Sequence, residues 1–384
     1  MKKNSLIARL ALLPIRVAVY AALVFAVLMG VIYFTVFRDR INDNTLPGIL
    51  SVFHLSNRAR ASSDILIDSN PANQYGMYAN RLAVLSPERL VLYNGAGAES
   101  ASAVIRMENP KLRTAGNTAA AFDRGGKTCI IAGEKGVEAA YDTDTVITVD
   151  LTEKGCYAIA TEKSGYNGAV SVYDASHYKF FEWYSSESGY VQDIALNKDA
   201  SLLAVVSDRQ ENESFLSRLT LLRTDREDPL AAIDIPDRLI YSLRFMSRDH
   251  LCVVLEDEIR FYAANGELIG IYYLEGRYYL DAQISDGLCA VLTGRQASAY
   301  HSMLALLNRA GELIGEIALE ETPVDSISVA GSYAGVLQNG TLSLYNAKGA
   351  LCFAQEDLTQ CKKFFAAPDG AALMVAQDRA FWIE

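Results

Sequence analysis

Histidine and tryptophan are scarce in this sequence, which has four and two of them among 384 residues. The histidines are His54, His177, His250 and His301, and no two of them are spaced as H-E-x-x-H or H-x-H. The chain also lacks the G-x-S-x-G, P-loop and G-x-G-x-x-G patterns. These absences remove the usual local signatures of metal sites, nucleophilic catalysis and nucleotide binding. We therefore predict no catalytic residue, no metal and no cofactor.

Six cysteines are too few for a disulfide scaffold in a chain of this length, and none of them forms a C-x-x-C pair. Cys252 in HLCVVL and Cys289 in GLCAVL lie in similar apolar runs, which indicates buried free thiols. A bridge between Cys352 and Cys361 is the alternative for the one pair that is close in sequence.

Negative charge dominates after residue 62. Residues 1–62 hold eight basic and two acidic side chains, which leaves 27 basic and 44 acidic residues and a net charge of −17. So acidic a domain is repelled by phosphate backbones and anionic lipid headgroups. We expect no nucleic acid as partner, and instead a protein or another cell-envelope ligand.

Residues 17–37 form an uncharged apolar run of 21 positions. A helix of that length matches a bilayer core of about 30 Å, whereas the apolar region of a signal peptide, the competing interpretation, is only about 7–15 residues. Four basic residues and no acidic residue precede the run, which predicts a cytoplasmic N-terminus. The expected segments are a cytoplasmic tail (1–16), a transmembrane helix (17–37), a stalk (38–62) and an extracytoplasmic domain (63–384).

A short apolar strand followed by a turn recurs along residues 63–384. The clearest copy is GAVSVYDASHYKFFEWY, and the others are LVLYNGAGAES, IRFYAANGELIG, LALLNRAGELIG and LSLYNAKGALC, with three weaker copies. The matched positions are Tyr93, Ala132, Tyr173, Leu222, Tyr262, Leu307, Tyr345 and Ile383, at spacings of 38 to 49 residues. Such a period is typical of a β-propeller with four strands per blade. We predict an all-β, eight-bladed propeller; seven blades and a two-sheet sandwich are the alternatives.

Turns rich in Asp and Gly are expected to join the first two strands of the repeats. They are Asp123-Arg124-Gly125-Gly126, Asn197-Lys198-Asp199-Ala200, Ser247-Arg248-Asp249-His250, Ser285-Asp286-Gly287 and Pro368-Asp369-Gly370. Tight turns favour Asp and Gly for backbone reasons, so we do not assign these carboxylates to a metal or to catalysis.

The chain ends before its last repeat is complete. Only Glu384 follows the third strand of that repeat, so the fourth strand is missing. The alternating segment 63–68 precedes the first repeat and has the length of one strand. We predict that Ile65–Ile67 pairs with Ala380–Ile383 and closes the ring, because an open edge would leave backbone groups unpaired.

Three connections between the second and third strands exceed the two to five residues that a turn needs. They are Glu162–Gly168, Ser207–Ser214 and Thr293–His301, all expected on one face. Loop variation without a task is the alternative explanation. The candidate partner contacts are Tyr166, Asn167, Arg209, Gln210, Arg295, Gln296 and Tyr300.

The block TEKSGYNGAVSVYD, followed by FFEWYSSESGYVQDIALNKDASLLAVV, resembles a functionally uncharacterised bacterial family. The resemblance spans nearly the whole chain and implies one N-terminal membrane helix and an extracytoplasmic propeller-like domain. More distantly, the repeats resemble WD40-like and quinoprotein-like propellers. The tryptophan motif expected in each quinoprotein blade is missing, since Trp183 and Trp382 are the only tryptophans.

Together these features predict a membrane-anchored, non-catalytic binding or scaffolding module of the cell envelope. The alternative is a hydrolase or lactonase-like propeller with an axial carboxylate or metal site, because a propeller can gather such residues from several blades without a local motif. Convergence of three or more Asp, Glu or His side chains on the axis would favour the enzyme.

Overall fold

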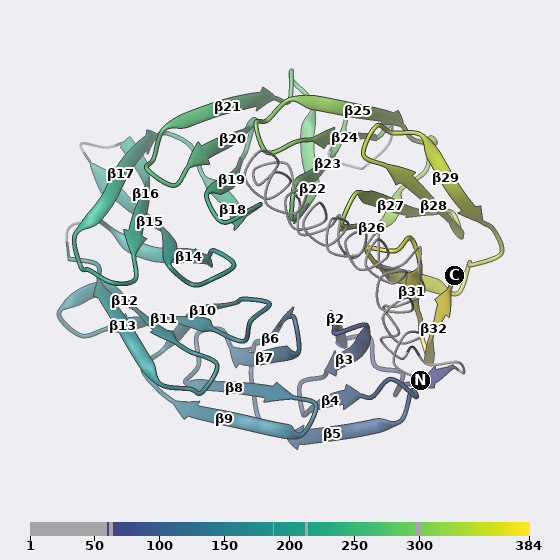
Figure 1. Ribbon diagram of the computed structural model, residues 1–384, viewed down its shortest axis with the longest axis horizontal. Coiled ribbons are helices and arrows are strands. Elements are labelled where there is room, and N and C mark those ends of the chain that lie inside the picture. The colour runs from purple at the N-terminus through teal and green to yellow at the C-terminus, as the bar shows by residue number, and fades with distance from the viewer. Residues whose placement is uncertain (1–59, 61–63, 187, 212–213, 296–300) are drawn as a thin grey trace, which may run out of the picture.

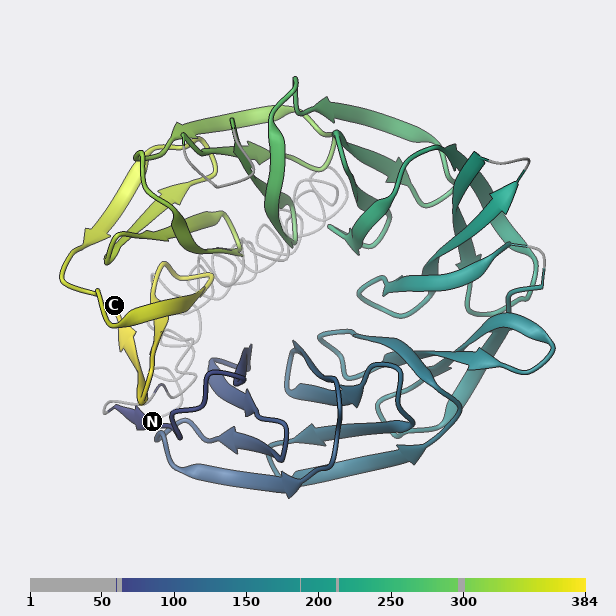
Figure 2. The same ribbon diagram turned by 180° about the vertical axis from the view of Figure 1, so that it is seen from behind.

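The computed structural model describes residue 60 and residues 64–384, except residues 187, 212–213 and 296–300. In this part of the chain there are 32 strands and no helix. The strands form eight four-stranded antiparallel sheets, arranged as blades around a central axis (Figures 1 and 2). The predicted eight-bladed propeller is confirmed, and the seven-bladed and sandwich alternatives are wrong.

In each of the first seven blades the strands follow the chain from the axis outward. Blade 1 contains β2 (Gln74–Tyr78), β3 (Arg81–Leu85), β4 (Arg89–Tyr93) and β5 (Glu99–Val104). Blade 2 contains β6 (Pro110–Ala115), β7 (Thr118–Asp123), β8 (Thr128–Gly133) and β9 (Gly136–Asp142). Blade 3 contains β10 (Val146–Leu151), β11 (Tyr157–Lys163), β12 (Tyr166–Tyr173) and β13 (Lys179–Tyr184). Blade 4 contains β14 (Tyr190–Leu196), β15 (Leu202–Glu211), β16 (Ser214–Arg223) and β17 (Pro229–Pro236).

The second half of the ring repeats this order. Blade 5 contains β18 (Ile240–Phe245), β19 (His250–Leu255), β20 (Glu258–Ala263) and β21 (Leu268–Tyr273). Blade 6 contains β22 (Tyr278–Ser285), β23 (Leu288–Gly294), β24 (Met303–Leu307) and β25 (Leu313–Ala318). Blade 7 contains β26 (Val324–Ala330), β27 (Tyr333–Gln338), β28 (Thr341–Asn346) and β29 (Leu351–Gln355). Blade 8 contains β30 (Cys361–Ala366), β31 (Ala372–Ala376), β32 (Arg379–Ile383) and β1 (Ile65–Leu66).

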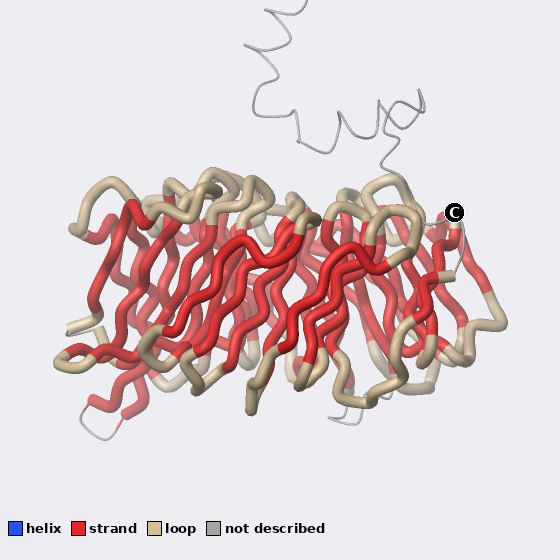
Figure 3. The backbone as a smooth tube through the Cα atoms, turned by 90° about the horizontal axis from the view of Figure 1, so that it is seen from below, coloured by secondary structure: helices blue, strands red, loops and turns tan. Residues whose placement is uncertain are grey.

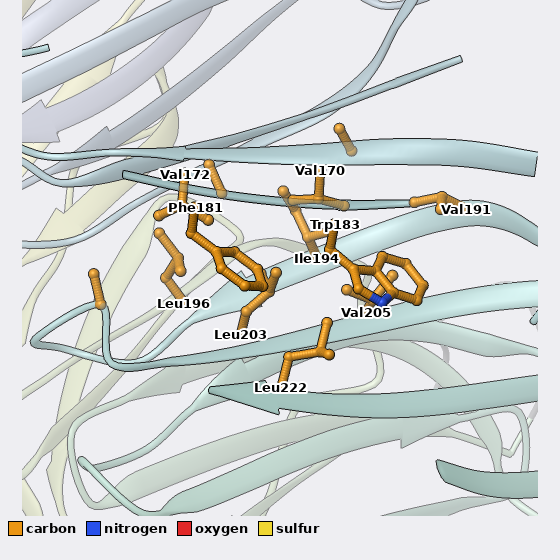
Figure 4. Packing of buried hydrophobic residues seen from close by; sticks show 13 residues of the cluster. Val170, Val172, Phe181, Trp183, Val191, Ile194, Leu196, Leu203, Val205 and Leu222 are labelled. Atoms are coloured by element: carbon orange, nitrogen blue, oxygen red, sulfur yellow. The ribbon is translucent and has the colours of Figure 1, made fainter. Parts of the chain in front are cut away.

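All eight matched positions of the sequence repeat lie on the third strand of a blade, from β4 to β32. The apolar residues of these strands are buried between neighbouring blades. For example, Val172, Phe181 and Trp183 of blade 3 pack against Leu203 and Val205 of blade 4 (Figure 4). Burial of side chains of this size stabilises the fold by roughly 1.5–3 kcal/mol each, so the period reflects one interface repeated around the ring.

The two ends of the domain close the ring, as predicted, although the partner residues are 378–380 and not the predicted Ala380–Ile383. Ile65 of β1 pairs with Ala380 of β32, and Leu66 pairs with Arg379. Ile65 is buried at 1% exposure, whereas Leu66 is 75% exposed. The strand thus fills the outer position of blade 8 and covers the edge that β32 would otherwise leave open.

The ring has two faces. The hairpin face carries the connections from second to third strands and from one blade to the next. The terminal face carries the other two connections of each blade, together with Asp64 and Glu384 (Figure 3). On the terminal face, the Arg60 guanidinium lies 4.6 Å from the centroid of the Trp382 ring and pairs with Asp369. The chain therefore enters the propeller from the rim of this face.

One turn assignment from the sequence is wrong. Residues 123–126 join β7 to β8, the second and third strands of blade 2. The first two strands are joined instead by Gly116-Asn117, where Gly116 has a φ of +53°. A Cβ at Gly116 would lie 2.1 Å from the Glu153 carbonyl oxygen, so glycine permits this short turn.

Two of the three predicted long loops are extended hairpins. β11 continues to Lys163 and β12 begins at Tyr166, which leaves only two residues in the turn. β15 and β16 stay paired as far as Glu211 and Ser214. In both hairpins the two strands stay paired beyond the residues at which the alternation of apolar and polar side chains ends in the sequence. Only the connection between β23 and β24 remains a long loop.

The predicted transmembrane helix (17–37), the tail and nearly all of the stalk lie outside the described residues. Among the described residues, no helix is long and apolar enough to cross a membrane.

Candidate functional site at the propeller axis

The first strands of the blades surround the axis, and six of them contain a β-bulge at the same place. The irregularities lie between Val146 and Thr148, Val191 and Asp193, Ile240 and Ser242, Tyr279 and Asp281, Val324 and Ser326, and Cys361 and Lys363. A bulge redirects the following side chain. In all six strands that side chain is polar.

The pairing with the second strands places two further residues at this level, Gln74 and Lys111. The upper layer is therefore polar in every blade: Gln74, Lys111, Thr148, Asp193, Ser242, Asp281, Ser326 and Lys363. Two residues further along the strands lies the lower layer: Gly76, Arg113, Asp150, Ala195, Arg244, Gln283, Ser328 and Phe365. Residues between the layers, such as Ile194, Leu243 and Phe364, are buried against neighbouring blades. Because side chains alternate along a strand, the two layers share the other side of these strands; Arg113, Arg244 and Lys363 are exposed there, whereas Ala195 and Phe365 pack into the clusters between blades.

The two layers hold seven charged side chains, four cations and three carboxylates, and six of them form a group that we call the axial charges: Arg113, Asp150, Asp193, Arg244, Asp281 and Lys363; the seventh is Lys111. Their charges act on one another across one intervening blade. The charge of Arg113 in blade 2 acts on Asp193 in blade 4, and that of Arg244 in blade 5 acts on Asp150 in blade 3. The group carries three positive and three negative charges.

The axial charges are partly desolvated. Burial raises the pKa of Asp193 to about 6, with Arg113 opposing the shift and Asp150 adding to it. Burial also raises the pKa of Asp150 and of Asp281. The Lys363 side chain reaches solvent, yet the surrounding protein lowers the pKa of its ammonium, and Asp281 opposes that shift.

Side chains of the two layers also join neighbouring blades. Asp150 Oδ2 accepts a hydrogen bond of 2.7 Å from the Leu196 backbone N–H in the next blade. Ser328 Oγ accepts one of 2.9 Å from the Ala366 N–H. Gln74 Oε1 accepts one of 3.1 Å from the Leu112 N–H. These contacts fix the first strands, whose inner edges have no neighbouring strand.

The axial carboxylates do not form a metal or acid cluster. Among the described residues, no three His, Cys, Asp or Glu side chains are grouped so that they could hold a metal ion. Asp150 and Asp193 lie on neighbouring strands, but each is within the field of an arginine.

The predicted contacts of blade 3 lie on the hairpin face. Tyr166 is 46% exposed, and its ring centroid lies 4.7 Å from that of Tyr184. The Asn167 side chain donates a 3.0 Å hydrogen bond to the Ser186 carbonyl oxygen. Tyr166 thus offers an open aromatic surface, while Asn167 also supports the local backbone.

The predicted contacts of blades 4 and 6 lie on the same face. Arg209 Nη2 lies 2.8 Å from Glu211 Oε2 and 3.9 Å from Asp234 Oδ2. Gln210 and Arg295 are exposed. Gln296 and Tyr300 lie outside the described residues. Blades 3 and 4 are neighbours, whereas blade 5 separates Arg295 from the other contacts.

Exposed tyrosines surround the axis on this face. Tyr190, Tyr241 and Tyr278, at the entry ends of the first strands of blades 4, 5 and 6, are 66%, 45% and 54% exposed. The rings of Tyr241 and Tyr279 lie 5.4 Å apart between centroids. We call Tyr190, Tyr241 and Tyr278 the tyrosine rim.

Sequence reasoning missed the axial charges. Their signal was a polar residue interrupting the first apolar strand of every repeat, and it could have been found by aligning those strands. The bulge made this signal hard to recognise. In six of the first strands, one extra residue shifts the alternation of apolar and polar side chains by one position.

The sequence model of DUF5711, described as a family of unknown function, matches residues 56–381 of this chain. This chain belongs to that family. The match begins ahead of β1 and ends within β32, so it spans nearly the whole propeller and includes the closing strand β1. No curated protein matches the chain.

Solved structures share the fold of this DUF5711 protein at low sequence identity. A eukaryotic initiation factor aligns with a TM-score of 0.53 and 11% identity, over 87% of this chain and 92% of the factor. Chaetomium thermophilum Sqt1, bound to the N-terminus of the ribosomal protein L10, aligns with a TM-score of 0.53 and 12% identity, over 84% of this chain and 100% of Sqt1. These likenesses concern the propeller fold only.

Proposed function

We propose that this DUF5711 protein is a membrane-anchored, extracytoplasmic binding module that does not catalyse a reaction. The axial charges carry this proposal: three aspartates, Asp150, Asp193 and Asp281, lie at the axis together with cations, and no three His, Cys, Asp or Glu side chains among the described residues are grouped so that they could hold a metal ion. A metal-dependent hydrolase needs such a group to activate water. The arrangement instead favours recognition of a charged partner.

The proposed anchor rests on the sequence, and its proposed position rests on where the chain enters the ring. The uncharged run at residues 17–37 has the length of a membrane span. Arg60 and β1 bring the chain into the ring at the rim of the terminal face. In our proposal the terminal face is therefore turned toward the membrane, and the hairpin face with its tyrosine rim is displayed away from it.

A polypeptide is the partner that we favour. The structurally similar Sqt1 is bound to the N-terminus of a ribosomal protein, so a ring of this kind can hold a protein segment. The net charge of −17 for residues 63–384 disfavours nucleic acid as partner. The hairpin face, with its extended hairpins and exposed tyrosines, is suited to such a contact.

The orientation can be tested with reporters fused after Glu384 of the full chain. A reporter that is active only in the cytoplasm should be silent, because the positive charges before residue 17 hold the N-terminus inside. A reporter that is active only outside should give signal. A strong cytoplasmic signal would overturn the proposed location.

A further inference from the structure

We propose that Cys252 and Cys289 are a redox-sensitive pair, whose oxidation to a disulfide links blade 5 to blade 6. The Sγ atoms of the two side chains lie 3.8 Å apart, and both residues are fully buried. Cys252 lies on β19 and Cys289 on β23, the second strands of neighbouring blades. This inference goes beyond the binding function, because it concerns the ring itself and not its partner.

The pair lies at a contact that is repeated between second strands around the ring. Cys252 pairs with Phe261, the residue just before the matched position Tyr262 of the sequence repeat. In the other seven blades the same register position holds Ala83, Ala120, Ala158, Ala204, Ala290, Gly335 and Leu373. Six of these seven residues are alanine or glycine. Since protein interiors are close-packed, such small side chains indicate that the backbones of neighbouring blades come close together here.

Sulfur is not required for packing at either position. Cys289 pairs with the matched position Leu307, and residues in the same register in three other blades are Ala119, Ala334 and Ala372. Alanine thus fills both places elsewhere in the ring. Blades 5 and 6 instead place two thiols in direct contact.

The gap between the two sulfur atoms is short enough for bond formation. An S–S bond is about 2.05 Å long, so the atoms must approach each other by roughly 1.8 Å. The movement is shared by two side chains, each of which turns about its χ1 bond. Val254, Phe261 and Val291 belong to the same buried cluster. A disulfide is neutral, so its formation leaves no unpaired charge among these apolar groups.

The oxidant is a small disulfide such as oxidised glutathione. One cysteine attacks it as a thiolate, forms a mixed disulfide and releases one glutathione thiol, and the second cysteine then displaces the other. Two protein thiols and one donor disulfide become one protein disulfide and two donor thiols. The protons of the cysteines pass to the leaving thiolates, so atoms and electrons balance.

Burial controls when this exchange can occur. It raises the pKa of the Cys252 thiol, and neither cysteine reaches solvent. Because the thiolate is the attacking species, the exchange requires blades 5 and 6 to separate transiently. Once the blades close again, the same burial shields the new bond from reductants.

The test uses the detergent-purified full chain, incubated with oxidised glutathione at temperatures that rise toward its melting midpoint. Trypsin cleaves after arginine, which leaves Cys252 in the peptide 249–260 and Cys289 in the peptide 278–295. We expect mass spectrometry without reductant to find these two peptides joined, at about 2 Da below the sum of their masses. The link should persist when dithiothreitol meets the folded chain and disappear when the chain is denatured first.

Thermal melting gives a second measurement. The bond joins positions that are 37 residues apart and so restricts the unfolded chain. We expect the oxidised chain to melt about 5 °C or more above the reduced chain.

Single variants assign the link. Cys252→Ala and Cys289→Ala place alanine where other blades carry it, so both should fold, as a cooperative melting transition of the reduced protein would show. Neither should give the joined peptides or the rise in melting temperature. Cys129→Ala removes another buried thiol, in blade 2, and should retain both effects.

Three results would overturn the proposal. The peptides could remain separate after incubation at the melting midpoint, each could carry glutathione in place of the other, or Cys252→Ala could keep the rise in melting temperature.

The link and the proposed location can fail separately. A cytoplasmic reporter signal would overturn the location and remove the oxidising compartment, but the glutathione experiment would still decide the link. Separate peptides in that experiment would overturn the link and leave the binding module intact.

Discussion

At the scale of single residues, similar side chains have different surroundings in this protein. Cys252 and Cys289 lie with their sulfur atoms 3.8 Å apart between blades 5 and 6, and both are buried free thiols, as their apolar sequence context predicted. Cys352 and Cys361 are also free, so the alternative of a bridge between them is wrong. For Asp193 the sequence context does not predict the surroundings of the side chain. Its strand is apolar, whereas its own side chain is directed to the axis.

Asp193 should make the protein more stable as the pH falls. Its pKa is about 6 in the folded state and 3.8 ordinarily, so the folded protein binds this proton more tightly than the unfolded chain does. The stabilisation is fully present below about pH 4 and is lost as the pH rises through 6. We expect Asp193→Asn to raise the free energy of unfolding by on the order of 2 kcal/mol at pH 7.5, with the difference narrowing below pH 6.

Denaturant unfolding at several pH values measures this difference. Asp228→Asn, in an exposed turn, serves as the control and should match the original protein throughout. A constant difference between Asp193→Asn and the original protein from pH 7.5 to pH 5 would contradict the assignment.

At the scale of elements, β1 is very short but has a large effect on the structure. It contains two residues, yet it covers the edge of β32 and packs into the cluster between blades 8 and 1. Ile65 contacts this cluster with Leu82, Leu373 and Ala380, all buried. Leu66 points outward on the same strand.

Truncation of Ile65 should therefore destabilise the ring much more than truncation of its neighbour. Ile65→Ala removes buried methyl groups and leaves a cavity, which costs about 2–5 kcal/mol. Leu66→Ala should change stability by less than about 0.5 kcal/mol. Thermal melting of the full chain compares the two, with a fall of roughly 5 °C or more expected only for Ile65→Ala. Equal melting of both variants would mean that closure by β1 contributes little.

At the scale of the whole molecule, the two faces differ in what they carry. The terminal face receives the chain from its N-terminal side, with Arg60 against Asp369 and Trp382. The hairpin face carries the predicted contacts and the tyrosine rim. Partner binding should therefore depend on one face only.

Partner capture from membranes by the full chain can test this difference. The triple variant Tyr166→Ala, Gln210→Ala and Arg295→Ala should reduce recovery of the specific partner by about tenfold, since aromatic and arginine contacts dominate most interfaces. Arg248→Ala changes a side chain that is 72% exposed on the terminal face and should leave recovery unchanged. If the triple variant captures as much partner as the original protein, the hairpin face is not the binding surface.

The sequence by itself determined the architecture and its closure, because the third strand of each blade must present the same apolar pattern to its neighbours, and because the last repeat lacked one strand. Local pattern was enough for these features, which depend on contacts between adjacent strands. The sequence also placed Tyr166 and Gln210 near the hairpin face, although the lengths of the connecting loops were misjudged where strand pairing continued.

Only the tertiary structure decided the axial site. Asp193, Arg244 and Lys363 are far apart in the chain, and a bulge that no residue type announces turns most of the upper layer toward the axis. These residues surround the same axis only once eight blades have closed into a ring.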